Sequence, residues 1–133
     1  MAQDAHAART MALRAVDHLS HRQIDQLASL FAEDALMTFP FAPEGFSQRI
    51  EGREAIAKAL RILSDLFASF EITATRAVAD QHGDVVIEAE SVATLKDGKP
   101  YRNGYVFVVE VRDGAIRLWK EYNNPMRLPR PAA

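Results

Sequence analysis

PYRNGYVFVVEVRDGAIRLWKEYNNP, residues 100–125, is the part of the chain from which its architecture is most directly inferred. Runs of β-branched and aromatic residues at 106–111 and 115–122 flank the pair Asp113-Gly114. An Asp-Gly pair tolerates the positive φ that a tight turn between antiparallel strands requires. The stretch is therefore predicted to form a β-hairpin.

Two registers of this hairpin are possible, and they place different side chains on one face. A two-residue loop pairs Val106 with Glu121 and Glu110 with Arg117. A three-residue loop closed by a glycine bulge at Gly114 instead makes the pairs Asn103–Asn123, Tyr105–Glu121, Phe107–Trp119 and Val109–Arg117. We prefer the second register because it collects the amides, the tyrosine, the carboxylate and the large aromatic side chains on one face.

Neither face of such a hairpin is the usual solvated polar one. The second face holds a mostly apolar set: Val106, Val108, Ile116, Leu118 and Tyr122. The sheet is therefore expected to be covered on both sides. Helices and a pocket would cover one side, and an apolar partner such as a second subunit would cover the other.

Composition narrows the class of protein. The 133 residues suit a single domain spanning 1–133, and the absence of cysteine excludes a disulfide scaffold, a thiol nucleophile and a thiolate metal site. A net charge of -2 gives no indication of a nucleic-acid or anionic-membrane partner. No apolar run of about 18 residues is present, and residues 1–10 lack the apolar centre of a signal peptide. We therefore expect a soluble, cytoplasmic protein.

The rest of the chain reads as helices followed by strands. Helices are predicted at about 5–19, from Ile24 to Glu33-Asp34, and at about 53–69, where a long apolar stripe marks the principal core helix. A short extended segment at 35–41 is stopped by Pro40 and Pro43, and the stretch from Phe41 to Gly52 is a loop with aromatic residues. From Glu71 onward the patterns are all typical of strands, so the domain is predicted to be α+β.

This order of elements resembles the nuclear transport factor 2-like superfamily, and within it the SnoaL-like group that includes polyketide cyclases. FAEDALMTFP, EGREAI and DGAIRLWKEYNNP carry the resemblance, which runs from about residue 10 to 127. Ketosteroid isomerases, limonene epoxide hydrolases and phenazine biosynthesis A/B proteins are also similar. The resemblance implies a cone-shaped α+β barrel in which three N-terminal helices pack on a strongly curved, mainly antiparallel sheet. It also implies an apolar pocket at the mouth of the cone and a homodimer formed through the sheet.

The resemblance also implies positions for site residues. The family's acid on the last strand, in the pattern W-x-[DE]-[YF]-x-[DN]-P, corresponds to Glu121, with Trp119 beside it in the pocket wall. Asp34 stands where the family often has a pocket-facing or structural acid, although a role in capping the turn is the alternative.

Reasoning from the residues themselves also points to Glu121. Among Trp119, Phe107 and Tyr105 the carboxyl would lose water, and its pKa would rise toward neutrality, which suits proton transfer. The alternative is a solvent-facing carboxylate paired with Arg102 or with a lysine. Tyr105 could donate a hydrogen bond to a substrate oxygen, or could simply be a core residue with its hydroxyl at the edge.

The remaining candidates would bind or enclose a substrate. Asn103 and Asn123 could hold its polar groups, although Asn123 also suits the end of a strand. The expected wall of the pocket consists of Trp119, Phe107, Phe39, Phe41 and Phe46. We expect an isomerase- or cyclase-type enzyme that acts on a small hydrophobic carbonyl compound with no metal or organic cofactor. The alternative is a non-catalytic domain that binds a hydrophobic ligand or forms dimers.

Overall fold

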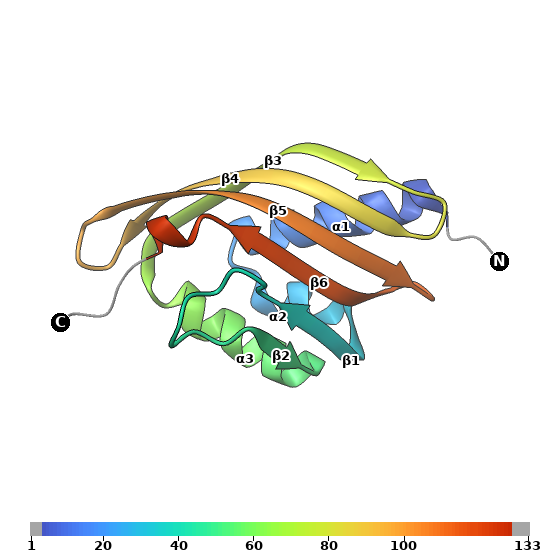
Figure 1. The fold of residues 1–133 in the computed structure, drawn as a ribbon, viewed down its shortest axis with the longest axis horizontal. Coiled ribbons are helices and arrows are strands. Elements are labelled where there is room, and N and C mark those ends of the chain that lie inside the picture. Colours follow the sequence, from blue (N-terminus) through green and yellow to red (C-terminus); the bar gives the residue numbers. More distant parts are fainter. Residues whose placement is uncertain (1–3, 129–133) are drawn as a thin grey trace.

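The computed structural model describes residues 4–128, which form three α-helices, six β-strands and a terminal 3-10 turn (Figure 1). In chain order the elements are α1 (Ala5–Ser20), α2 (Ile24–Ser29), β1 (Phe31–Thr38), β2 (Arg49–Glu51), α3 (Arg53–Ser64), β3 (Phe67–Ala79), β4 (Asp84–Leu95), β5 (Pro100–Arg112), β6 (Ala115–Asn123) and η1 (Pro125–Arg127). No helix within residues 4–128 is long and apolar enough to cross a membrane.

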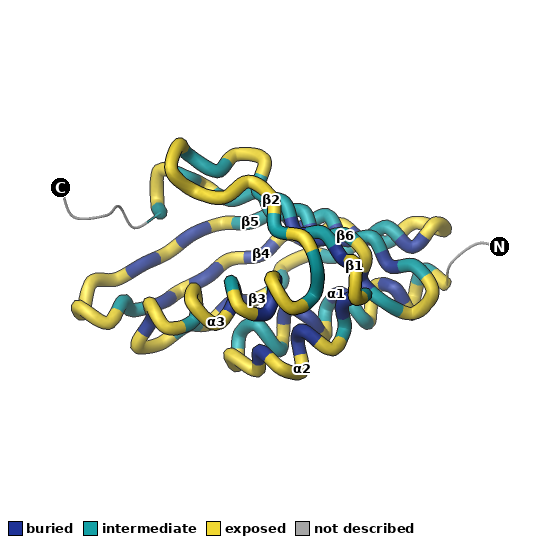
Figure 2. The backbone as a smooth tube through the Cα atoms, turned by 90° about the horizontal axis from the view of Figure 1, so that it is seen from below, coloured by how far each residue is buried: buried dark blue, intermediate teal, exposed yellow. Residues whose placement is uncertain are grey.

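The strands form one curved sheet in the order β2-β1-β6-β5-β4-β3. β1 runs parallel to β6, and all other neighbours are antiparallel. The three helices lie on one side of the sheet (Figures 1 and 2). The predicted α+β class and the curved, mainly antiparallel sheet are confirmed, and the sheet is an open cone because β2 and β3 remain edges.

The two later helices end earlier than the sequence predicts. α2 ends at Ser29 rather than at Glu33-Asp34, and Phe31 already belongs to β1, where its buried ring packs 6.2 Å from that of Trp119. α3 ends at Ser64 rather than near residue 69. Phe67 and Phe70 instead lie in β3, where a bulge between Phe67 and Ser69 keeps both rings together. Apolar residues three or four positions apart, which predict a helix, therefore also occur in a bulged strand.

The prediction that the helix after Gly52 is the principal core helix is wrong. α1 lies against β3 and contributes four buried residues, Ala8, Ala12, Ala15 and Val16. α3 packs mainly against β1 and α2 and buries only Ile56, Ala57 and Leu60. α1 therefore packs on the β3 side of the sheet and also contacts β4 and β5, whereas α3 packs on the β1 side.

The closing hairpin combines features of both registers considered above. Its loop has two residues, Asp113 and Gly114, both with positive φ, and Arg112 pairs with Ala115. A bulge then inserts Arg117, so that Val111 pairs with Ile116 but Glu110 pairs with Leu118. The preferred three-residue loop and its residue pairs are therefore wrong. The predicted faces are correct from Leu118 onward, because the bulge moves the later part of β6 by one residue. They are wrong before the bulge, because Ile116, predicted on the outer face, is buried opposite Val111.

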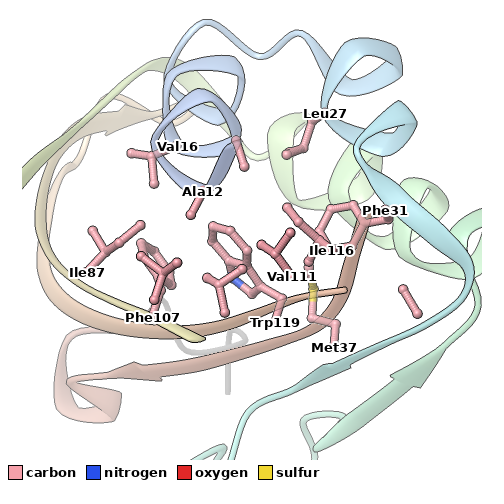
Figure 3. Packing of buried hydrophobic residues seen from close by; sticks show 14 of the residues in the cluster. Ala12, Val16, Leu27, Phe31, Met37, Ile87, Phe107, Val111, Ile116 and Trp119 are labelled. Carbon is pink, nitrogen blue, oxygen red and sulfur yellow. The ribbon is translucent and has the colours of Figure 1, made fainter. Parts of the chain in front are cut away.

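The inward face of the hairpin forms the centre of the core. Phe107, Val109 and Trp119 are buried, whereas the neighbours that alternate with them are only partly covered. The rings of Phe107 and Trp119 lie 4.7 Å apart beneath Ala12 and Val16 of α1 (Figure 3). This core fixes the position of the next inward side chains along β6.

Candidate active site

Glu121 is the inward residue that follows Trp119 on β6 and pairs with Phe107 of β5. The residue is half-buried, and its carboxylate accepts a hydrogen bond from Asn123 Nδ2 at 3.0 Å. Burial raises the pKa of the Glu121 carboxyl to about 7, although the hydrogen bonds from Asn123 and Trp119 partly oppose this. Glu121 can therefore both accept and release a proton near neutral pH.

Tyr105 supplies a phenol on the same face of the sheet. Its hydroxyl lies 2.8 Å from Ser91 Oγ of β4, and its ring stacks on Phe107 with centroids 5.4 Å apart. Burial, with smaller contributions from the Tyr101 hydroxyl and the Glu121 charge, raises the pKa of Tyr105 above its usual value. Tyr105 therefore remains protonated in the folded protein and can donate a hydrogen bond.

Asn103 and Asn123 have different surroundings. Asn123 lies on β6 and donates to Glu121, so it touches the candidate acid directly. Asn103 is buried, and its amide donates to the Tyr101 hydroxyl at 2.8 Å and to the Asn124 carbonyl at 3.1 Å. Asn103 thus joins β5 to the segment that follows β6.

The predicted aromatic wall is only partly assembled around Glu121. Phe107 and Trp119 are core residues that flank the carboxyl. Phe39 follows Thr38, the partner of Lys120, and packs against the main core. Phe41 is 62% exposed and packs its edge against Tyr122, which lies on the opposite face of β6 from Glu121. Phe46 is also exposed, so the structure does not bring these two rings to the carboxyl.

Asp34 lies apart from the other candidates. Its side chain is exposed on β1 and pairs with Arg117 at 3.6 Å. Arg117 is the bulge residue near the turn end of β6, whereas Glu121 lies toward the other end of that strand. The structure therefore places Asp34 at the surface, in contact with the bulge.

Two residues of the site were not among the sequence candidates. Tyr101 and Ser91 are buried, and both hydrogen-bond to site residues, Tyr101 to Asn103 and Ser91 to Tyr105. Tyr101 could have been found, because side chains alternate along a strand and residues 101, 103 and 105 share a face. Ser91 depends on the register between β4 and β5, which pairs it with Asn103.

Two cavities stand out in the part of the chain that the structure describes, and neither is lined by Glu121 or Tyr105. An open groove of about 540 Å³ runs between α1 and β3, with Leu13, Val16, Phe70, Ile72 and Ala74 as its apolar lining. A second cavity of about 20 Å³ lies among α2, α3 and β3, with room for little more than a water molecule. Neither of these two cavities therefore forms a pocket around the Glu121 carboxyl.

Comparison with known protein families identifies the family of this chain. The model of the SnoaL-like domain matches residues 12–119. The chain belongs to the SnoaL-like family. An uncharacterised, PhzA/B-like protein of Pseudomonas aeruginosa is 34% identical to this SnoaL-like protein over 106 residues, which cover 74% of this chain and 70% of that protein.

Two solved structures show what this SnoaL-like protein is similar to. A protein of Bacillus subtilis provisionally described as an isomerase is 29% identical, with a TM-score of 0.81 and coverage of 93% of this chain and 91% of that one. A protein of Kribbella flavida provisionally described as a ketosteroid isomerase is 27% identical, with a TM-score of 0.70 and coverage of 97% and 86%. The fold is thus shared with proteins that are provisionally described as isomerases.

Proposed function

We propose that this SnoaL-like protein is an isomerase- or cyclase-type enzyme that transfers a proton within a small hydrophobic carbonyl compound. The observation that carries the proposal is the Glu121 carboxyl, whose pKa burial raises to about 7, on the same face as a protonated Tyr105. Solved relatives described as isomerases support the reaction class. Neither proton transfer nor hydrogen bonding to the carbonyl oxygen requires a cofactor.

The proposed reaction uses both groups in turn. The Glu121 carboxylate takes a proton from a carbon next to the carbonyl, and the C–H electron pair becomes the double bond of an enolate. Tyr105 donates a hydrogen bond to the oxygen on which the negative charge develops. Glu121 then returns the proton to another carbon, which gives an isomer. Alternatively, the enolate carbon attacks a second carbonyl of the same molecule, and Glu121 returns the proton to the alkoxide oxygen that this leaves, which gives a ring.

Neither cavity reaches Glu121, so on this proposal the substrate reaches the partly exposed carboxyl by another route, which a movement of the chain would widen. The segment between β1 and β2 begins beside the site, since Thr38 pairs with Lys120, the neighbour of Glu121. Displacement of this segment, which carries the exposed Phe41 and Phe46, would open the half-buried side of the carboxyl.

Hydrogen–deuterium exchange at carbon tests the proposal without knowledge of the natural substrate. The probe is 2-tetralone in D₂O, whose hydrogens next to the carbonyl are followed by NMR. The wild-type protein should accelerate the exchange, and Glu121→Gln should lower the rate at least about 100-fold because a general base is lost. Glu90→Gln, at an exposed position of β4, is the matched control and should retain the wild-type rate. Equal rates for the wild type and Glu121→Gln would remove Glu121 from the mechanism.

A second candidate function is non-catalytic binding of a hydrophobic ligand. The observation that favours it is the groove between α1 and β3, whose volume of about 540 Å³ lies in the range of small-molecule sites. Binding of the fluorescent dye ANS that is lost in Ala74→Trp but kept in Glu121→Gln would support this function.

Homodimer formation through the sheet is part of the main proposal. Val78, Val86 and Val108 form a continuous row across β3, β4 and β5 on the face away from the helices. Val78 and Val86 are 51% and 42% exposed, and a second copy of the sheet would bury this row.

A further inference from the structure

We propose that Tyr101 is a second hydroxyl donor to the substrate oxygen beside Tyr105, and that Asn103 is a positioning residue that fixes the direction of its hydrogen bond. This inference rests on the function proposed for Glu121. It assigns to the site two roles that follow from hydrogen bonds on β4 and β5.

The amide of Asn103 has only one possible orientation. Its Oδ1 accepts the backbone N–H groups of Gly104 at 2.8 Å and of Asn124 at 3.0 Å. Its Nδ2 donates to the Asn124 carbonyl at 3.1 Å and to the Tyr101 hydroxyl at 2.8 Å. A flipped amide would set Nδ2 against two N–H donors and Oδ1 against a carbonyl, so the surrounding backbone holds the amide as it is.

This orientation determines where the Tyr101 hydrogen goes. Because Nδ2 can only donate, the Tyr101 oxygen is the acceptor in the bond from Asn103, and its own hydrogen must point elsewhere. Tyr101 is also held in place by its ring, which packs 5.6 Å from that of Phe67. Tyr101 and Tyr105 lie near enough for each to affect the pKa of the other, and the Tyr105 hydroxyl lies 2.8 Å from Ser91 Oγ.

The row Asn103–Tyr101–Tyr105–Ser91 is thus made of two hydrogen-bonded pairs, Asn103–Tyr101 and Tyr105–Ser91, whose phenol hydroxyls share the inward face. When a negatively charged substrate oxygen binds at this row, both phenols can donate a hydrogen bond to it. Asn103 Nδ2 continues to donate to the Tyr101 oxygen. Burial is the main cause that raises the pKa of each phenol, and the Glu121 charge adds to the increase in both. Both phenols thus stay protonated, and Glu121 lies near enough to act on both.

The chemistry of the row indicates which class of ligand it would bind. It has two hydroxyl groups that can donate hydrogen bonds, and no basic side chain. The row suits an oxygen that becomes an anion while the molecule stays otherwise apolar, such as the oxygen of an enolate or a phenolate. Phe107, which stacks on Tyr105, and Phe67, which packs on Tyr101, would contact the apolar part.

The test uses 4-nitrophenol, whose ionised form absorbs visible light and imitates an enolate without needing turnover. Wild-type protein should bind the ionised form in preference to the neutral one. Tyr101→Phe should weaken binding of the ionised form about tenfold or more, because it removes one hydrogen bond to a charged oxygen. Tyr122→Phe makes the same chemical change on the opposite face of β6 and should stay within about twofold of the wild type.

Asn103 is tested by Asn103→Asp, which replaces the donor Nδ2 by an acceptor of the same size. The Tyr101 hydrogen should then turn toward residue 103, and the ratio of ionised to neutral bound 4-nitrophenol should fall at least as far as in Tyr101→Phe. A purely structural defect would weaken both forms alike. Thermal unfolding of each variant accompanies the titration, and Tyr101→Phe provides the test by itself if Asn103→Asp does not fold.

The outcomes separate this inference from the proposed function. Unchanged binding of the ionised form by Tyr101→Phe would overturn the role of Tyr101, and an unchanged ratio in folded Asn103→Asp would overturn that of Asn103. Wild-type protein that binds only the neutral form would overturn both. The role of Glu121 would still be decided by the exchange of 2-tetralone, which is a separate measurement.

Discussion

The pH dependence of stability gives a direct test of the buried carboxyl. Burial raises the Glu121 pKa from 4.5 to about 7 in the folded protein. A folded carboxyl with a raised pKa contributes full stability below about pH 4.5 and loses it as the pH rises toward 7. The difference of about 2.5 pH units corresponds to about 3 kcal/mol of unfolding free energy. Above pH 7 both states are ionised and the loss is complete.

Glu121→Gln should therefore remove this dependence. Urea unfolding at pH 4.5 should give similar free energies for wild type and variant, because both side chains are neutral there in the folded state. At pH 8.5 the variant should be the more stable by about 3 kcal/mol, since an amide carries no charge to bury. Glu90→Gln, at an exposed position, should follow the wild type at both pH values. Parallel pH curves for the wild type and Glu121→Gln would refute the burial of the carboxyl in a dry environment.

Three further perturbations test the core, the surface acid and the outer face of the sheet. Phe107→Ala should lower the unfolding free energy by about 3–5 kcal/mol in urea, because the ring is fully buried against Trp119, and a loss below about 1 kcal/mol would contradict its core position. Asp34→Asn should change stability by less than about 1 kcal/mol and leave the exchange of 2-tetralone unaltered, since its pair with Arg117 is exposed, whereas slower exchange would give Asp34 a catalytic role. Val86→Glu should convert a wild-type dimer into a monomer in light scattering, and an unchanged mass would exclude this face as the interface.

The class of fold could be predicted because it depends on coarse patterns. Apolar residues at helical spacing gave α1, and the turn residues Asp97-Gly98 and Asp113-Gly114 separated long strands that the structure confirms. The ends of α2 and α3 could not be predicted in the same way. At Phe67 and Phe70 a bulged strand places residues three apart on one face, which is also the spacing of a helix.

The candidate site was predictable only in part. Alternation placed Tyr105 with Phe107 on β5 and Trp119 with Glu121 on β6, because that argument needs only the two-residue period of a strand. That both pairs share one face depends on the register, which the bulge in β6 sets. Ser91 depends on pairing between β4 and β5, which the sequence does not specify by itself. The positions of Phe41 and Phe46 depend on how an irregular segment returns from β1 to β2, and no period governs such a segment.

The inward direction of Glu121 depends on the bulge at Arg117. A two-residue loop without a bulge would pair Glu121 with Val106, and the carboxyl would then face away from the helices. Ile116 and Trp119 explain why the bulge forms, because both are buried although they lie three residues apart, and a regular strand would send them to opposite faces. The core therefore forces an extra residue into β6, and that residue turns Glu121 toward Phe107. The exposed Asp34–Arg117 pair contributes little to this choice, because burying Ile116 and Trp119 together is worth several kcal/mol and a surface ion pair less than about one.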